Sequence, residues 1–147
     1  MAKLTVTTIV KTTLEKSWEA LWNPAHIIHW AFADEKTWHC PWANWAYPKV
    51  WELFTTRMEA KDWSFGFDLS GKYLSVDPLR SMSYSLGWIK DDFIDSWRVV
   101  EIKLEELSEG IKITETFDAE EINSEERQIE GWQMILENYK KYVESLN

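Results

Sequence analysis

The sequence contains little cysteine, glycine or proline, and it lacks any long apolar run. Its one cysteine, Cys40, excludes an intramolecular disulfide and fits a reducing compartment, so the cytoplasm is the expected location. Five glycines and four prolines form neither a linker nor a phosphate-binding loop. The N-terminal residues alternate polar and apolar side chains, which excludes a signal peptide or membrane span there. We therefore expect a single domain over residues 1–147.

Basic residues are also in deficit. The chain has 16 lysines and arginines against 25 aspartates and glutamates, which gives a net charge of −9. Such a surface repels phosphate backbones and anionic lipid headgroups, so neither nucleic acid nor a membrane is an expected partner. The acidic residues concentrate between Glu101 and Glu130. This stretch is either a solvated face or a docking face for a basic partner.

Tryptophan, by contrast, is in excess, with 11 copies. Its side chain combines a large apolar surface with an N–H that needs a partner. Extra copies therefore indicate a cavity wall, a protein interface or deliberate design, and composition alone leaves all three open.

Alternating apolar residues and turn signals predict six β-strands. The first covers residues 3–11, where both faces are rich in β-branched side chains. The stretch 32–48 is rich in aromatic residues but has no period, so we predict a loop there. The other predicted strands cover 49–60, 65–77, 80–89, 96–106 and 110–118.

Helical periodicity occurs in two parts of the sequence. Residues 14–22 carry apolar side chains at helical spacing, and Asn23-Pro24 ends that helix and begins a short second one. From Ser124 onward, an apolar stripe predicts a helix of about 20 residues or more. The element order predicts an α+β fold, in which a curved six-stranded antiparallel sheet surrounds the long C-terminal helix.

Several short runs make the chain similar to a known family. They are Asn23-Pro24-Ala25-His26-Ile27, Trp38-His39-Cys40-Pro41, residues 57–62, Ser64-Phe65-Gly66-Phe67-Asp68, Thr114-Glu115-Thr116-Phe117 and Gly131-Trp132-Gln133. With these runs the chain resembles the heat-shock-protein-90 ATPase activator homologue family, which belongs to the START-like superfamily. The resemblance covers essentially the whole chain. It implies the helix-grip fold, whose sheet and long helix enclose an apolar cavity.

The chain departs from the family pattern at several turns. Val50-Trp51 stands where the family tends to have a Gly-Gly pair, and Trp63 stands where it tends to have a glycine. A bulky residue at positive φ costs on the order of 1 kcal/mol or more. Either the chain is a family member with an unusually aromatic cavity, or it is an engineered variant, which the joint loss of several glycines favours. The tryptophans outside the family pattern are Trp42, Trp45, Trp51, Trp63, Trp88 and Trp97.

The resemblance implies a pocket, because the sheet and the long helix of a helix-grip fold cannot fully meet in the middle. We expect the inner face of each strand and the apolar stripe of the long helix to line it, with plain core packing as the alternative for each side chain. The residues expected to bind a ligand there are Trp51, Leu53, Phe67, Leu69, Tyr84, Leu86, Trp97, Val100, Trp132, Ile135, Leu136 and Tyr139.

No catalytic residue, cofactor or metal site is predicted. His26 and His29 lack the further convergent ligands that zinc needs, and no nucleophile motif surrounds Cys40. Some START-like relatives act as polyketide cyclases, in which polar cavity groups orient the substrate and move protons. The residues that could supply such groups are Arg57, Asp68, Tyr73, Tyr84 and Glu101.

Three functions follow from these observations, in descending order. The first is a non-enzymatic binding module that holds a small hydrophobic ligand in an apolar, Trp-lined cavity. The second is a protein–protein interaction module, resembling a chaperone activator or forming a homodimer, that uses exposed tryptophans. The third is an enzyme of the polyketide-cyclase kind.

Overall fold

The computed structural model describes residues 2–44, 48–90, 93–94 and 98–147. Within this part, eight strands and three helices follow one another along the chain. The helices are α1 (Leu14–Trp22), α2 (Pro24–Ile27) and α3 (Glu125–Ser145). The strands are β1 (Lys3–Val10), β2 (Trp38–His39), β3 (Leu53–Ala60), β4 (Gly66–Asp77), β5 (Ser81–Lys90), β6 (Phe93–Ile94), β7 (Arg98–Leu107) and β8 (Gly110–Asp118).

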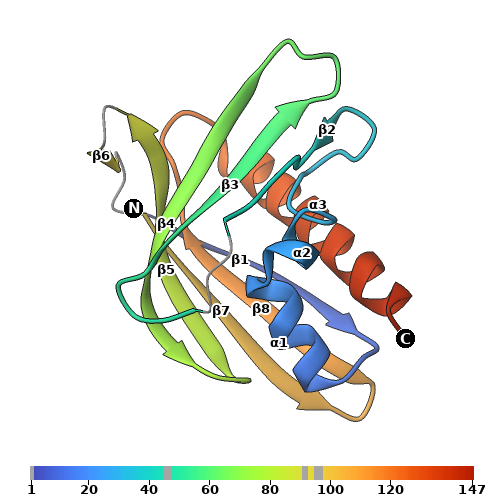
Figure 1. The fold of residues 1–147 in the computed structure, drawn as a ribbon. Coiled ribbons are helices and arrows are strands. Elements are labelled where there is room, and N and C mark those ends of the chain that lie inside the picture. The colour runs from blue at the N-terminus through green and yellow to red at the C-terminus, as the bar shows by residue number, and fades with distance from the viewer. Residues whose placement is uncertain (1, 45–47, 91–92, 95–97) are drawn as a thin grey trace.

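The strands form a curved antiparallel sheet that α3 crosses on one side, with α1 and α2 beside it (Figure 1). The strand order is β1-β8-β7-β5-β4-β3-β2, and β6 pairs with β5 outside this path. The helix-grip prediction is confirmed, and the six predicted strands are present. The structure adds the short strands β2 and β6. It also starts β3 at Leu53, because Trp51 has a positive φ that strand geometry excludes.

The sequence encodes the starts of α1 and α2 through capping side chains. Thr13 accepts a hydrogen bond from the Lys16 N–H at 3.3 Å and so begins α1. Asn23 ends α1 and caps α2, where its side chain accepts from the Ala25 N–H at 3.0 Å and Pro24 occupies the first turn. This break between two short helices is the one that Asn23-Pro24 predicts.

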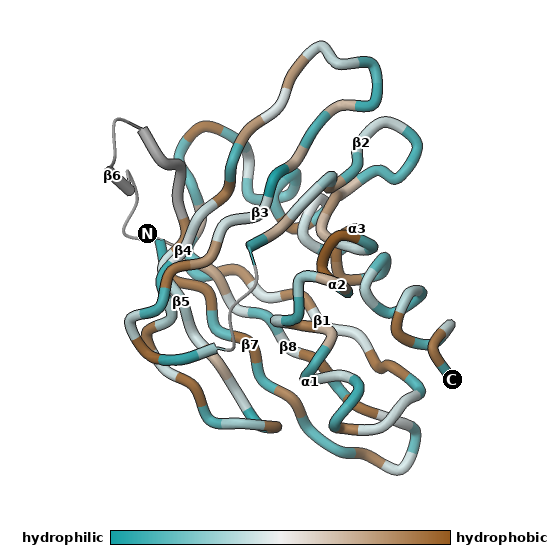
Figure 2. Tube along the Cα trace, in the orientation of Figure 1, coloured by the Kyte–Doolittle hydropathy of each residue, from teal (hydrophilic) through white to brown (hydrophobic). Residues whose placement is uncertain are grey.

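Helix α3 closes the core against the sheet. Its Leu136, Tyr139 and Val143 are buried, and the Tyr139 hydroxyl donates to the Ser17 carbonyl of α1 at 2.6 Å. Figure 2 shows the complementary pattern on the sheet, where apolar and polar residues alternate along β7 and β8. Apolar side chains from both layers therefore meet between the sheet and the helix.

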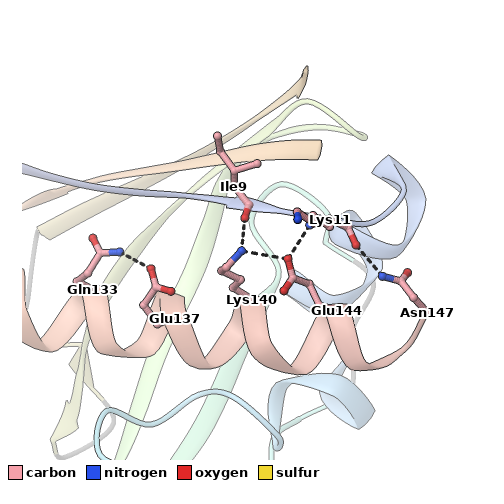
Figure 3. Close-up of polar contacts among 7 residues, drawn as sticks. All are labelled: Ile9, Lys11, Gln133, Glu137, Lys140, Glu144 and Asn147. Atoms are coloured by element: carbon pink, nitrogen blue, oxygen red, sulfur yellow. Dashed lines mark hydrogen bonds and ion pairs between the residues drawn. The ribbon is translucent and has the colours of Figure 1, made fainter. Parts of the chain in front are cut away.

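The C-terminal half of α3 is tied to the edge strand β1 by a polar clasp (Figure 3). Lys140 donates to the Ile9 carbonyl at 2.7 Å and pairs with Glu144 at 3.0 Å. Glu144 accepts from the Lys11 N–H at 2.8 Å, and Asn147 donates to the Lys11 carbonyl at 2.6 Å. The Lys11 N–H and the Lys140 ammonium lower the pKa of Glu144. The clasp occupies polar backbone groups that an edge strand otherwise leaves open.

Two tryptophans adopt the left-handed backbone conformation that is expected at positions where the family tends to have glycine. Trp51 has φ of 75° and Trp63 has φ of 66°. Their side chains are 66% and 80% exposed, so little burial offsets the strain. The Lys72 ammonium lies 4.9 Å from the centroid of the Trp51 ring.

Replacing Trp63 with glycine should therefore stabilise the protein. We expect the free energy of unfolding to rise by about 1 kcal/mol, because glycine adopts positive φ without a Cβ clash. Trp63→Ala is the matched control, since it removes the same indole but keeps the Cβ. Urea unfolding of both variants checks this, and equal stability of the Gly and Ala variants would contradict the strain argument.

Candidate functional site

An inner cavity of about 120 Å³ lies between the sheet and the three helices. Most of its wall is apolar, and every helix and five of the strands contribute to it. The lining residues are Leu21, Ile27, Trp30, Ala31, Phe54, Thr56, Met58, Leu69, Tyr73, Met82, Tyr84, Leu86, Ile102, Glu115, Trp132 and Ile135.

A second, outer pocket of about 310 Å³ adjoins the inner cavity. It lies between the first half of α3, the ends of the central strands and the segment that leads into β2. Arg98, Glu120, Asn123, Arg127 and Gln128 give it a polar side. Five residues line both spaces: Met58, Leu69, Leu86, Trp132 and Ile135.

Aromatic rings form two sides of the inner cavity. On the sheet, Phe54 lies 5.0 Å from Tyr73 and 5.1 Å from Tyr84, measured between ring centroids. On α3, Trp132 stacks on Phe117 of β8 with centroids 4.0 Å apart and planes 9° apart. These contacts fix the orientation of the rings, so the cavity has preformed walls.

One ionisable acid, Glu115, lies in this apolar setting. It is only 5% exposed, and desolvation raises its pKa from the ordinary value of 4.5 to about 7. Its carboxyl makes no hydrogen bond or ion pair within the described part of the chain. Burial likewise raises the pKa of Tyr73 to about 12, and it raises that of Tyr84, where Glu115 contributes.

The structure places the predicted lining residues in different environments. Phe67, Leu69, Tyr84, Leu86, Trp132 and Ile135 line one or both spaces, as the alternation predicts. Val100, Leu136 and Tyr139 instead pack in the buried core and are not among the residues that line these two spaces. Trp97 lies outside the described residues.

For β3, the predicted inward face is wrong. Trp51 and Leu53 are 66% and 59% exposed, while Phe54, Thr56 and Met58 line the inner cavity. Side chains alternate across a strand, so an error of one residue exchanges its two faces. The sequence Leu53-Phe54 offers an apolar residue in either register, and only the pairing with β4 decides between them.

Sequence reasoning missed Glu115. The inward positions of β8 are Ile111, Ile113, Glu115 and Phe117, all of them buried. A glutamate between isoleucine and phenylalanine on the apolar side of an alternating strand was the signal that could have found it. The cyclase hypothesis named Glu101 instead, which is exposed and pairs with Lys103 at 3.3 Å.

Of the other polar candidates, Tyr73 and Tyr84 line the inner cavity, whereas Arg57 and Asp68 do not. Arg57 pairs with Asp68 at 3.1 Å across β3 and β4, and neither is among the residues that line the two spaces. Burial raises the pKa of Cys40 to about 11, which keeps it a protonated thiol at neutral pH. His26 hydrogen-bonds the Tyr142 hydroxyl at 2.6 Å, and His29 stacks on the same ring.

The described part of the chain also shows neither a cluster of metal ligands nor a membrane-spanning helix. No group of three or more His, Cys, Asp or Glu residues in this part of the chain could hold a metal ion. No described helix has the length and apolar character needed to cross a membrane.

Comparison with known proteins identifies the family. The family model described as activator of Hsp90 ATPase homolog 1-like protein matches residues 11–144. No curated protein matches the sequence. Among solved structures, an AHSA1-like protein from Aeromonas hydrophila is 30% identical with a TM-score of 0.86, and the match covers 99% of this chain and 94% of that one.

Two further structures agree. A protein from Cytophaga hutchinsonii is 37% identical with a TM-score of 0.77, over 98% of this chain and 93% of that one. An AHSA1 protein from Silicibacter pomeroyi shares the fold with a TM-score of 0.80 at 18% identity, over 99% of this chain and all of that one. The chain therefore belongs to the activator of Hsp90 ATPase homolog 1-like protein family.

Proposed function

We propose that the protein binds a small hydrophobic ligand between the sheet and α3. The observation that carries this proposal is the apolar space whose inner cavity and outer pocket share Met58, Leu69, Leu86, Trp132 and Ile135. A well-packed core has few voids larger than a water molecule. A larger cavity in the centre of the domain is therefore better explained as a ligand-binding site than as imperfect packing.

The dimensions of the two spaces support a ligand rather than trapped water alone. The inner cavity, at about 120 Å³, approaches the size of an engineered apolar cavity that stays dry and binds benzene. The outer pocket, at about 310 Å³, lies at the lower end of the range for small-molecule sites. A ligand that fills both must be considerably larger than benzene, with an apolar body that extends from the inner cavity into the outer pocket.

Filling the shared wall should abolish binding. Ile135 lines both spaces, so Ile135→Trp places an indole in the volume that a ligand would take. The matched control is Ile129→Trp, the same substitution on the more exposed side of α3. We expect the affinity for the neutral naphthalene dye prodan, measured by its fluorescence, to fall at least about tenfold in the first variant only. Equal affinity in both variants would sink the proposal.

A protein–protein interaction module is the second candidate, and the exposed tryptophans favour it. Trp51 and Trp63 project their side chains into solvent, and Trp42 is also exposed. Exposed tryptophans are common anchors of interfaces. Sedimentation of the bare protein separates the candidates, because a homodimer gains mass with concentration whereas a ligand carrier does not. Dimerisation without any prodan response would favour the second candidate.

A further inference from the structure

The inner cavity has an acid at its wall and no basic residue among the described residues that line it. Glu115 contributes the acid, and no lysine, arginine or histidine is among the described residues that line this cavity. The titratable groups near its carboxyl are Tyr84 of β5 and Tyr139 of α3, which it influences electrostatically, and Tyr73 of β4, which lines the same cavity. All three are tyrosines whose pKa burial raises, so they stay neutral at physiological pH. When Glu115 is ionised, no described residue of the cavity wall compensates its charge, whereas a cationic ligand would.

Aromatic rings in the same cavity would attract a cation together with that carboxylate. Phe54, Tyr73 and Tyr84 of the sheet, Trp132 of α3 and Trp30 of the turn that follows α2 line the same cavity. Trp30 is held in place by its N–H, which donates to the Ala20 carbonyl at 2.9 Å. Rings that surround a cation attract it through their negative faces, and the attraction grows when the site is desolvated. A carboxylate among such rings is suited to an ammonium group.

From this geometry we infer that the ligand is a hydrophobic amine, whose ammonium group pairs with Glu115 in the inner cavity and whose apolar body extends along Leu69, Leu86 and Ile135. The inference rests on the proposed function and names the ligand class of that same site. A water molecule could satisfy hydrogen bonds to the carboxyl, but it would leave the buried charge uncompensated. The net charge of −9 adds a long-range attraction for a cation.

Three probes of one shape distinguish the ligand classes. Phenethylamine carries the cation, phenethyl alcohol is its neutral counterpart, and phenylacetate is the anion. We expect calorimetry at about pH 8 to rank the amine at least about tenfold tighter than the alcohol, with phenylacetate weakest. Equal binding of amine and alcohol would overturn the amine inference and leave the hydrophobic site standing. Preference for phenylacetate would also overturn it and would direct attention to Arg98 and Arg127 of the outer pocket.

Glu115→Gln isolates the carboxylate. The amide keeps the size of the side chain but cannot pair with a cation, so the affinity for phenethylamine should fall about tenfold while that for the alcohol changes less than about threefold. Parallel loss of both would indicate a damaged cavity and overturn the assigned role of Glu115. If no probe binds and prodan also fails to bind, the hydrophobic site itself is refuted together with the inference.

The pH dependence gives a readout that a structural role would not produce. An alkylammonium, like a lysine side chain, stays charged across the neutral range, so of Glu115 and the three tyrosines only Glu115 titrates there. Between about pH 8 and pH 5.5, protonation of the carboxyl should weaken amine binding at least about tenfold. Near neutral pH, binding should release a proton, which calorimetry in buffers of different ionisation enthalpy detects. Amine affinity that does not change with pH, or binding without proton release, would contradict the inference.

Discussion

Glu115→Gln should raise the free energy of unfolding by about 3 kcal/mol at pH 8 and leave it almost unchanged at pH 4. The pKa of the Glu115 carboxyl in the folded protein is about 7, against an ordinary value of 4.5, because burial disfavours the charged form. A raised pKa means that the contribution of this group to stability is complete below about pH 4.5 and is lost as pH rises through 7. A neutral amide removes that loss.

Urea unfolding at the two pH values measures this difference. Glu101→Gln is the matched control, because Glu101 is a partly exposed glutamate whose replacement should change stability by less than about 0.5 kcal/mol. The control also accounts for the gain that any removed negative charge brings to an acidic protein. A Glu115→Gln gain of the same size at both pH values would show that the carboxyl is not desolvated.

Phe117→Ala should cost the largest amount of stability, about 3 to 5 kcal/mol. The Phe117 side chain is fully buried and stacks on Trp132, so it connects the sheet to α3 beside the inner cavity. Its strand neighbours Leu4 and Val100 are buried as well, which leaves little freedom for the space to collapse. The substitution therefore removes apolar surface that folding buries, and it leaves a void in the core.

Thr116→Ala is the control for Phe117→Ala. Thr116 is the next residue on β8 and points to the opposite face, where its hydroxyl lies 3.4 Å from that of Thr5. We expect its replacement to cost about 1 kcal/mol or less. Chemical denaturation measures the free energy of unfolding of both variants, and the comparison requires that the dependence on denaturant concentration has the same slope in both. A Phe117→Ala cost near that of the control would mean that the aromatic stack does not hold α3 to the sheet.

Much of the fold follows from local patterns that the sequence displays directly. The helix break needs only Asn23-Pro24, and the start of α3 needs only a capping serine before an apolar stripe. Strands β7 and β8 alternate so regularly that their inner faces can be predicted without their neighbours. In contrast, β3 is apolar or neutral on both faces at its start, and its register depends on pairing with β4.

The candidate site was harder to predict for a physical reason. A cavity is the volume that side chains leave unfilled, so Val100, Leu136 and Tyr139 satisfy the same sequence pattern as the residues that line it. Core residues and cavity-lining residues differ only in how closely the surrounding side chains pack against them. Glu115 was within reach of sequence reasoning, since an acid on an apolar face needs a specific explanation.

The tryptophans give a mixed result. Trp51 and Trp63 do adopt the positive φ expected of positions that the family tends to fill with glycine, but both are exposed, so neither lines a cavity. Trp45 and Trp97 lie outside the described residues, as does the side chain of Trp88. The aromatic wall is formed instead by Trp30 and Trp132, with Trp38 at the outer pocket. The engineered origin stays a prediction.

The most direct test of a ligand site between the sheet and α3 is methyl NMR of the protein titrated with prodan. The methyl signals of Leu69, Leu86 and Ile135, which line both spaces, should shift in a saturable manner and show contacts to the dye. Leu53 and Ile129, whose side chains are exposed, should remain unchanged. Shifts confined to Leu53 and Ile129, or no saturable shift at any of the three lining residues, would contradict a binding site between the sheet and α3.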